Sequence, residues 1–221
     1  MIGADVGLSI SSALVIAIGL GKGMNALQSA TDRVFRAYYS HCQSPDKDSL
    51  FNFLNALHSF NEKLKSEKSE DLYDSVNFIG LKALRNLFHH HTELLHQIKL
   101  ISGIGLPISI ELARLCLVER SLVERAAHLP RERSPSTVIA AFNWYGTIAD
   151  IEPCIFNVVI DVFEKIEALR IVPTSEALEL FKRSYQHEAK KGFNHRVTGH
   201  ISCRAGDVST ILRHLFADTE A

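Results

Sequence analysis

Apolar side chains recur along this chain at intervals of three and four residues, a spacing that places them on one face of a helix. Four stretches carry the pattern over several turns, namely 24–38, 50–64, 76–98 and 155–169. No convincing run of alternating β-branched residues accompanies them, so the pattern predicts amphipathic helices throughout. The expected fold class is therefore all-α, a multi-helix bundle.

Residues that begin or end helices stand where this interpretation needs them. They are Pro107 and Pro153 for first turns, Thr174 and Asp207 as N-caps, and Gly192 as a helix end. A proline-containing loop at 130–135 is the best boundary along the chain. It divides a helical core at 1–129 from additional C-terminal helices at 130–221, which either pack on that core or continue it as one domain.

Two apolar segments, 8–20 and 100–118, need to be distinguished from membrane spans. The first is too short to cross a bilayer comfortably, and Glu111 and Arg114 interrupt the second. We expect both to be buried helices of a soluble protein without membrane contact. The four cysteines form no CxxC pair, which argues against a zinc ribbon or a disulfide framework and favours a cytoplasmic location.

The charge balance is nearly neutral, but one segment is basic. The formal net charge of −1 gives no global attraction for nucleic acid. Residues 182–214, however, hold seven Lys and Arg residues against two acidic ones. Clustered positive charge is typical of phosphate-binding surfaces, so Lys190, Lys191 and Arg196 are candidates for RNA binding. A solvated helix face would show the same pattern.

The most informative motif is Leu84-Arg85-Asn86-Leu87-Phe88-His89-His90-His91. Residues four apart share a helix face, which pairs Arg85 with His89 and Asn86 with His90. His91 falls on the apolar stripe instead. Arginine offers forked donors for phosphate, and histidine exchanges protons near neutral pH. The segment can therefore form a polar groove for RNA chemistry, or simply the polar edge of a helix.

The same residues resemble the R-x(4–6)-H signature of the HEPN superfamily, in which a polar residue, often Asn, follows the Arg. Arg85-Asn86-x-x-x-His90 has four residues between Arg and His. Arg85 to His91 has five and also fits, whereas Arg85 to His89 has three and does not. His89 and His91 remain alternates to His90. The motif covers about seven residues of the 221-residue chain.

This resemblance implies an all-α, metal-independent endoribonuclease that works as a homodimer without a cofactor. His90 would transfer protons as the ribose 2′-OH attacks the phosphate, Arg85 would stabilise the transition state, and Asn86 would orient the Arg or the phosphate. The family often adds an acidic residue from another helix, for which Glu62, Asp71 and Asp74 are all candidates. Such proteins often act as toxins or phage-defence effectors, held inactive by an antitoxin or another regulatory protein.

Two other classes of function compete with this interpretation. One is a non-catalytic helical binding or adaptor protein, in which Arg85 and the histidines shape an interface. The other is a metal-dependent helical enzyme that uses the histidine cluster. His195, His200 and Cys203 have loosely metal-like spacing, but no fourth ligand is evident, so we expect no metal site there.

Overall fold

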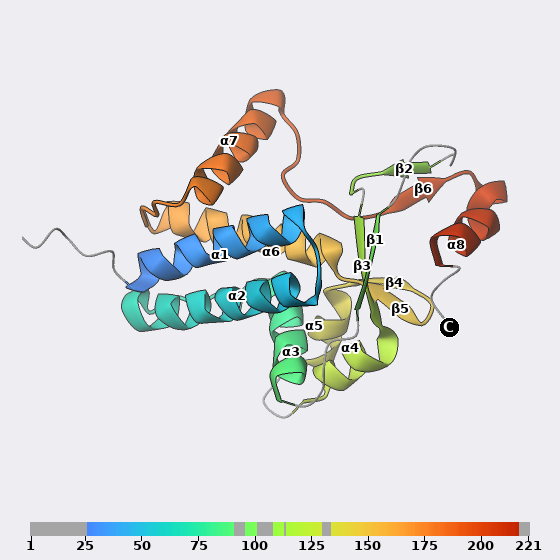
Figure 1. The fold of residues 1–221 in the computed structure, drawn as a ribbon, viewed down its shortest axis with the longest axis horizontal. Coiled ribbons are helices and arrows are strands. Elements are labelled where there is room, and N and C mark those ends of the chain that lie inside the picture. The colour runs from blue at the N-terminus through green and yellow to red at the C-terminus, as the bar shows by residue number, and fades with distance from the viewer. Residues whose placement is uncertain (1–25, 91–95, 101–107, 113, 130–133, 217–221) are drawn as a thin grey trace, which may run out of the picture.

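The structure of the protein is a computed structural model that describes residues 26–90, 96–100, 108–112, 114–129 and 134–216 (Figure 1). Most of the regular structure is helical, as the hydrophobic spacing predicted. The helices are α1 (Ala26–Gln43), α2 (Lys47–Lys68), α3 (Val76–His90), α4 (Arg120–Ala127), α5 (Pro135–Ala140), α6 (Glu152–Ala168), α7 (Glu176–Lys191) and α8 (Val208–Phe216). The short strands are β1 (His96–Leu100), β2 (Ile108–Ile110), β3 (Arg114–Glu119), β4 (Asn143–Tyr145), β5 (Ile148–Asp150) and β6 (Ile201–Cys203).

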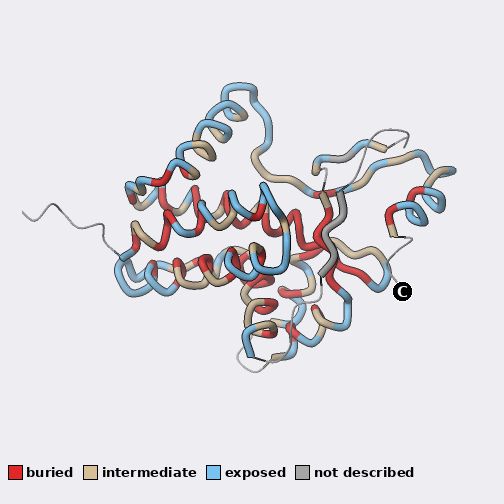
Figure 2. The backbone as a smooth tube through the Cα atoms, in the orientation of Figure 1, coloured by how far each residue is buried: buried red, intermediate tan, exposed pale blue. Residues whose placement is uncertain are grey.

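The helical part of the molecule is built around α1 and α2, which lie side by side (Figure 1). A capping box starts α2, because the Asp46 carboxylate accepts a hydrogen bond from the Ser49 backbone N–H at 2.7 Å and Ser49 Oγ accepts one from the Asp46 N–H at 2.9 Å. The helix ends at Ser69, which adopts a left-handed conformation with φ of 56°. Buried residues of α1, α2, α3 and α6, coloured red in Figure 2, share one hydrophobic core.

A four-stranded antiparallel sheet with the order β1-β3-β5-β4 forms the other part. Its central strand β3 is buried on both faces. Cys116 and Val118 belong to the main core, whereas Leu115 and Leu117 pack in a second cluster with residues of β5 and α8. The prediction of a helix over 100–118 is therefore wrong. A strand that is covered on both faces reads as a continuous apolar run, which spacing alone cannot distinguish from a buried helix.

The third apolar stripe also continues past the end of its helix. α3 ends at His90, and Ile98 lies in β1, opposite Cys116 of β3. Residues 91–95 between them lie outside the described residues, as do Pro107 and the apolar segment 8–20. Among the described helices, none has the length and apolar character needed to cross a membrane.

The helix boundaries near the C-terminus follow the predicted signals, with one shift. Pro153 lies in the first turn of α6, and Gly192 ends α7 with φ of 70°. The N-cap of α7 is Ser175 rather than Thr174, because the Ser175 side chain accepts a hydrogen bond from the Leu178 N–H. Thr174 instead donates from its N–H and hydroxyl to Asp32, a buried carboxylate of α1. This contact ties the start of α7 to α1.

Candidate functional site

Arg85 lies on α3 where that helix packs against α2. Its Nε donates a hydrogen bond to Oδ1 of Asn55 on α2 at 3.0 Å, and its Nη1 donates to Oδ1 of Asn86 at 3.3 Å. Both acceptors are neutral amides. Burial lowers the pKa of Arg85 from its ordinary value, yet a guanidinium remains charged in proteins. The side chain is thus fixed in position while its positive charge has no carboxylate partner among the described residues.

His58 of α2 adds an imidazole that the sequence analysis did not identify. Its Nδ1 is buried and makes no hydrogen bond with any part of the chain that the structure describes. Burial is the main cause that lowers the pKa of His58, and the positive charge of Arg85 lowers it further. His58 is therefore neutral at neutral pH and able to accept a proton.

His89 and His90 stand together at the exposed end of α3. Their Nδ1 atoms are 3.5 Å apart, and their ring centroids are 4.6 Å apart at an interplanar angle of 65°. The charge of Arg85 is the main cause that lowers the pKa of His89. His89 therefore interacts electrostatically with Arg85 and contacts His90. Only three residues separate it from Arg85 in the sequence, fewer than the R-x(4–6)-H motif requires. His91 lies outside the described residues.

The structure separates the three acidic candidates. Asp71 accepts a hydrogen bond from the Tyr73 N–H in a local turn, and Asp74 forms an ion pair with Lys165 at 3.4 Å. Glu62 instead interacts with His58. Its negative charge raises the pKa of His58 and so opposes the lowering by burial. Of the three, Glu62 is the one that interacts with the cluster around Arg85.

A sequence signal for the α2 side of this cluster existed but was not recognised. Asn55, His58 and Glu62 follow one another at intervals of three and four residues, so they share one face of α2. That polar stripe contacts the polar edge of α3 through the bond between Asn55 and Arg85. We call Arg85, Asn86, His89 and His90 of α3 with Asn55 and His58 of α2 the Arg85 cluster.

The structure does not place the basic candidates beside the Arg85 cluster. Lys190 and Lys191 are exposed in the last turn of α7, which rises above α1 in Figure 1, whereas α3 extends below α2. Arg196 forms ion pairs with Asp161 at 2.5 Å and Glu164 at 2.6 Å. Its charge is therefore already balanced within the fold.

The described residues gather no group of three or more His, Cys, Asp or Glu side chains that could hold a metal ion. His195 is hydrogen-bonded to Glu188 at 2.8 Å, and the rest of the loosely metal-like set does not join it. Comparison of the chain with family models, with curated proteins and with solved structures found no match. The chemistry of the site is therefore argued from its own residues.

Proposed function

We propose that this protein is a metal-independent endoribonuclease of the HEPN type that cleaves RNA by attack of the ribose 2′-OH. The observation that carries the proposal is the kind of partner that Arg85 has. Neutral amides hold it in place, and its charge is left to bind a phosphodiester beside imidazoles that are neutral at neutral pH.

In this mechanism each group of the Arg85 cluster has one task. A neutral imidazole accepts the 2′-OH proton as O2′ bonds to phosphorus, and an imidazolium protonates the leaving O5′ as the P–O5′ bond breaks. The products are a 2′,3′-cyclic phosphate and a 5′-OH end. His90 transfers one of these protons, Arg85 stabilises the charge that develops on the phosphoryl oxygens, and Asn86 orients Arg85.

The second proton-transfer group is supplied by His58 or His89, or by His90 of a second copy. The proposal includes a homodimer, because the end of α3 that carries His89 and His90 is exposed and accessible to another protomer. It also includes RNA as substrate, a cytoplasmic role in toxicity or phage defence, and control by an antitoxin or another regulatory protein.

A non-catalytic binding or adaptor protein is the alternative, and one observation favours it. The bond between Arg85 Nε and Asn55 Oδ1 joins α3 to α2, which is what a purely structural arginine would do. In that case the exposed histidines would contribute to an interface with another protein.

Cleavage of mixed cellular RNA in EDTA distinguishes these functions. We expect the wild type to cut, and Arg85→Ala and His90→Ala to lose roughly 10²- to 10⁴-fold in rate. His187→Ala, which removes an exposed histidine from α7, is the matched control and should cut normally. Circular dichroism of each variant checks folding.

Three outcomes would count against the nuclease. Cleavage that stops in EDTA would indicate a metal enzyme instead. Equal cutting by all variants would assign the activity to other residues or to a contaminant. A wild type that cuts no RNA, alone or after removal of co-purifying proteins, would leave the binding protein as the better conclusion.

A further inference from the structure

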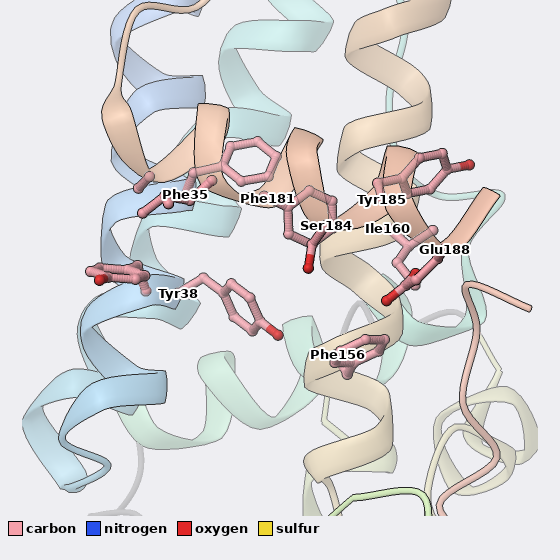
Figure 3. Close-up of a pocket in the computed structure, with 11 residues that line it drawn as sticks. Phe35, Tyr38, Phe156, Ile160, Phe181, Ser184, Tyr185 and Glu188 are labelled. Carbon is pink, nitrogen blue, oxygen red and sulfur yellow. The ribbon is translucent and has the colours of Figure 1, made fainter. Parts of the chain in front are cut away.

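A cavity of about 240 Å³ opens between α1, α6 and α7 (Figure 3). Most of its lining is aromatic. The rings come from all three helices and are those of Phe35, Tyr38, Tyr39, Phe156, Phe181 and Tyr185. The Arg85 cluster does not involve these residues, so the cavity is a separate feature.

The rings of α1 and α7 form one continuous wall. The centroid of Phe181 lies 5.3 Å from that of Phe35, 6.4 Å from that of Tyr38 and 6.5 Å from that of Tyr185. Phe181 and Tyr185 also contact Phe163, which is buried in the main core. Because the core holds the wall in place, the cavity is formed before any ligand arrives.

Three polar groups point into this aromatic space. Figure 3 shows the Ser184 hydroxyl, the Tyr38 hydroxyl and the Glu188 carboxylate directed toward the space between α1 and α6. Glu188 is the one acidic residue of the lining, which contains no Lys, Arg or His. The cavity is therefore lined by one carboxyl group and by aromatic rings, whose faces carry partial negative charge.

The carboxylate is also held in position. Glu188 Oε2 is 2.8 Å from Nδ1 of His195, and the His195 ring stacks on Tyr185 with centroids 3.6 Å apart and an interplanar angle of 17°. The Tyr185 hydroxyl donates to Glu164 at 3.2 Å, which fixes the ring from its far end. A carboxylate and a ring that are both anchored form a rigid corner of the cavity.

We propose that this cavity binds a small organic cation with an apolar body, such as a quaternary or tertiary ammonium compound. Ring faces attract a cation within about 6 Å of their centroids, and the effect grows when the cation is desolvated. Glu188 supplies the opposite charge, and the aliphatic side chains of Ile160 and Leu180 cover the apolar body. An anion would meet repulsion from both the carboxylate and the rings.

The probe pair that tests this is choline and 3,3-dimethylbutan-1-ol, which have the same shape but differ in charge. Titration of the full chain, followed by NMR through its aromatic ring protons, gives both affinities. We expect saturable binding of choline, at least about tenfold tighter than that of the neutral alcohol. Saturation transfer from the ring protons to the trimethylammonium group should accompany it.

Two variants locate the binding. Glu188→Gln should weaken choline binding about tenfold and leave the alcohol unchanged, and Ser184→Leu should block both by filling the cavity. Glu179→Gln removes an exposed carboxylate from the same helix and serves as the control. Equal affinity for the two probes, no saturable choline binding, or choline binding that Glu188→Gln and Ser184→Leu leave intact would each overturn the proposal.

Discussion

Arg85 in the helical part and Arg114 in the sheet part are both partly buried, but their charges have opposite kinds of partner. Arg114 begins β3 and forms an ion pair with the buried carboxylate of Glu152 on α6. Burial by itself would lower the pKa of Arg114, yet the Glu152 carboxylate outweighs burial and the pKa is raised. Arg85 has neutral amides instead, and burial lowers its pKa.

The difference separates an arginine that serves the fold from one that is available to a ligand. Glu152 neutralises the charge of Arg114 inside the protein. If either group were buried there without the other, its charge would destabilise the fold. Arg85 has no carboxylate partner in the part of the chain that the structure describes, so its charge is available there to an incoming phosphate. Arg196, which is paired with Asp161 and Glu164, belongs with Arg114 in this comparison.

The largest expected effect is on stability at Arg114. Arg114→Met leaves the Glu152 carboxylate buried without its cation, which should cost about 3–5 kcal/mol of unfolding free energy. Arg85→Met loses hydrogen bonds to two half-buried amides and should cost only about 0.5–1.5 kcal/mol. Urea denaturation of both variants measures the two losses side by side.

The double variant Arg114→Met/Glu152→Met is the control for this pair. Removing both charges should restore much of the stability, because the penalty comes from the carboxylate left alone. Equal losses for Arg85→Met and Arg114→Met would show that the two arginines serve the fold alike, and the distinction would fail.

A second effect concerns Asp150, a buried carboxylate in β5. Burial is the main cause that raises its pKa to about 7, against hydrogen bonds from the N–H groups of Cys116 and Glu152 that lower it. A folded-state pKa above the unfolded one means that the folded protein binds more protons between these values. Its contribution to stability is therefore full below about pH 4 and is lost as pH rises toward 7.

Asp150→Asn tests this pH dependence. An amide oxygen can still accept both backbone hydrogen bonds, but it does not ionise. Relative to the variant, the wild type should lose up to about 4 kcal/mol between pH 4 and pH 7.5, as measured by urea denaturation across that range. Parallel stability curves for the two proteins would contradict a raised pKa at Asp150.

A third effect concerns the packing of α3 against the residues between α5 and β4. A Cβ added at Gly80 of α3 would lie 2.5 Å from the Ala141 Cβ and 2.9 Å from the Phe142 ring, just beyond α5. We expect Gly80→Ala to cost about 1–2 kcal/mol of unfolding free energy, since the clash outweighs the gain in helix propensity. Gly206→Ala, where nothing lies within 4 Å, should change stability by less than about 0.5 kcal/mol.

Calorimetric melting of the two glycine variants gives this comparison directly. If Gly80→Ala melts as the wild type does, α3 and α5 have room to separate and the close approach is not a constraint. If it melts lower and also cuts RNA more slowly, the packing of α3 against Ala141 and Phe142 controls the position of the Arg85 cluster.

The two parts also differ in how far the sequence predicts them. α1, α2 and α6 are apolar on one side, so their spacing of three and four residues identifies them. β3 is covered on both faces, and its run from Leu115 to Val118 contains no polar residue to mark an alternation. β3 was missed for that physical reason.

The candidate site shows the same limit. Arg85, Asn86, His89 and His90 lie on one helix, so periodicity alone pairs Arg85 with His89 and Asn86 with His90. Asn55 and His58 reach Arg85 through the packing of α2 against α3. That contact joins residues 30 positions apart in the sequence. Spacing within one segment carries no information about such a contact.

The smallest expected effect is the most direct test of the comparison. Asn55→Asp replaces the neutral partner of Arg85 with a carboxylate, and so gives Arg85 the kind of pairing that Arg114 has. The folded state should keep its stability or gain up to about 1 kcal/mol, because a half-exposed ion pair contributes little. RNA cleavage should fall about tenfold, since the new carboxylate competes with phosphate for the guanidinium.

Asn52→Asp is the matched control, because it adds the same charge to an exposed position of α2. Rates of cleavage for the two variants, measured at low and high salt, separate a local pairing from a general loss of positive field, which salt would screen. A tenfold loss in Asn55→Asp alone means that the free charge of Arg85 is what the substrate requires. Equal rates in both variants would mean that the amide partner of Arg85 has no bearing on function, and the contrast with Arg114 would then be one of burial only.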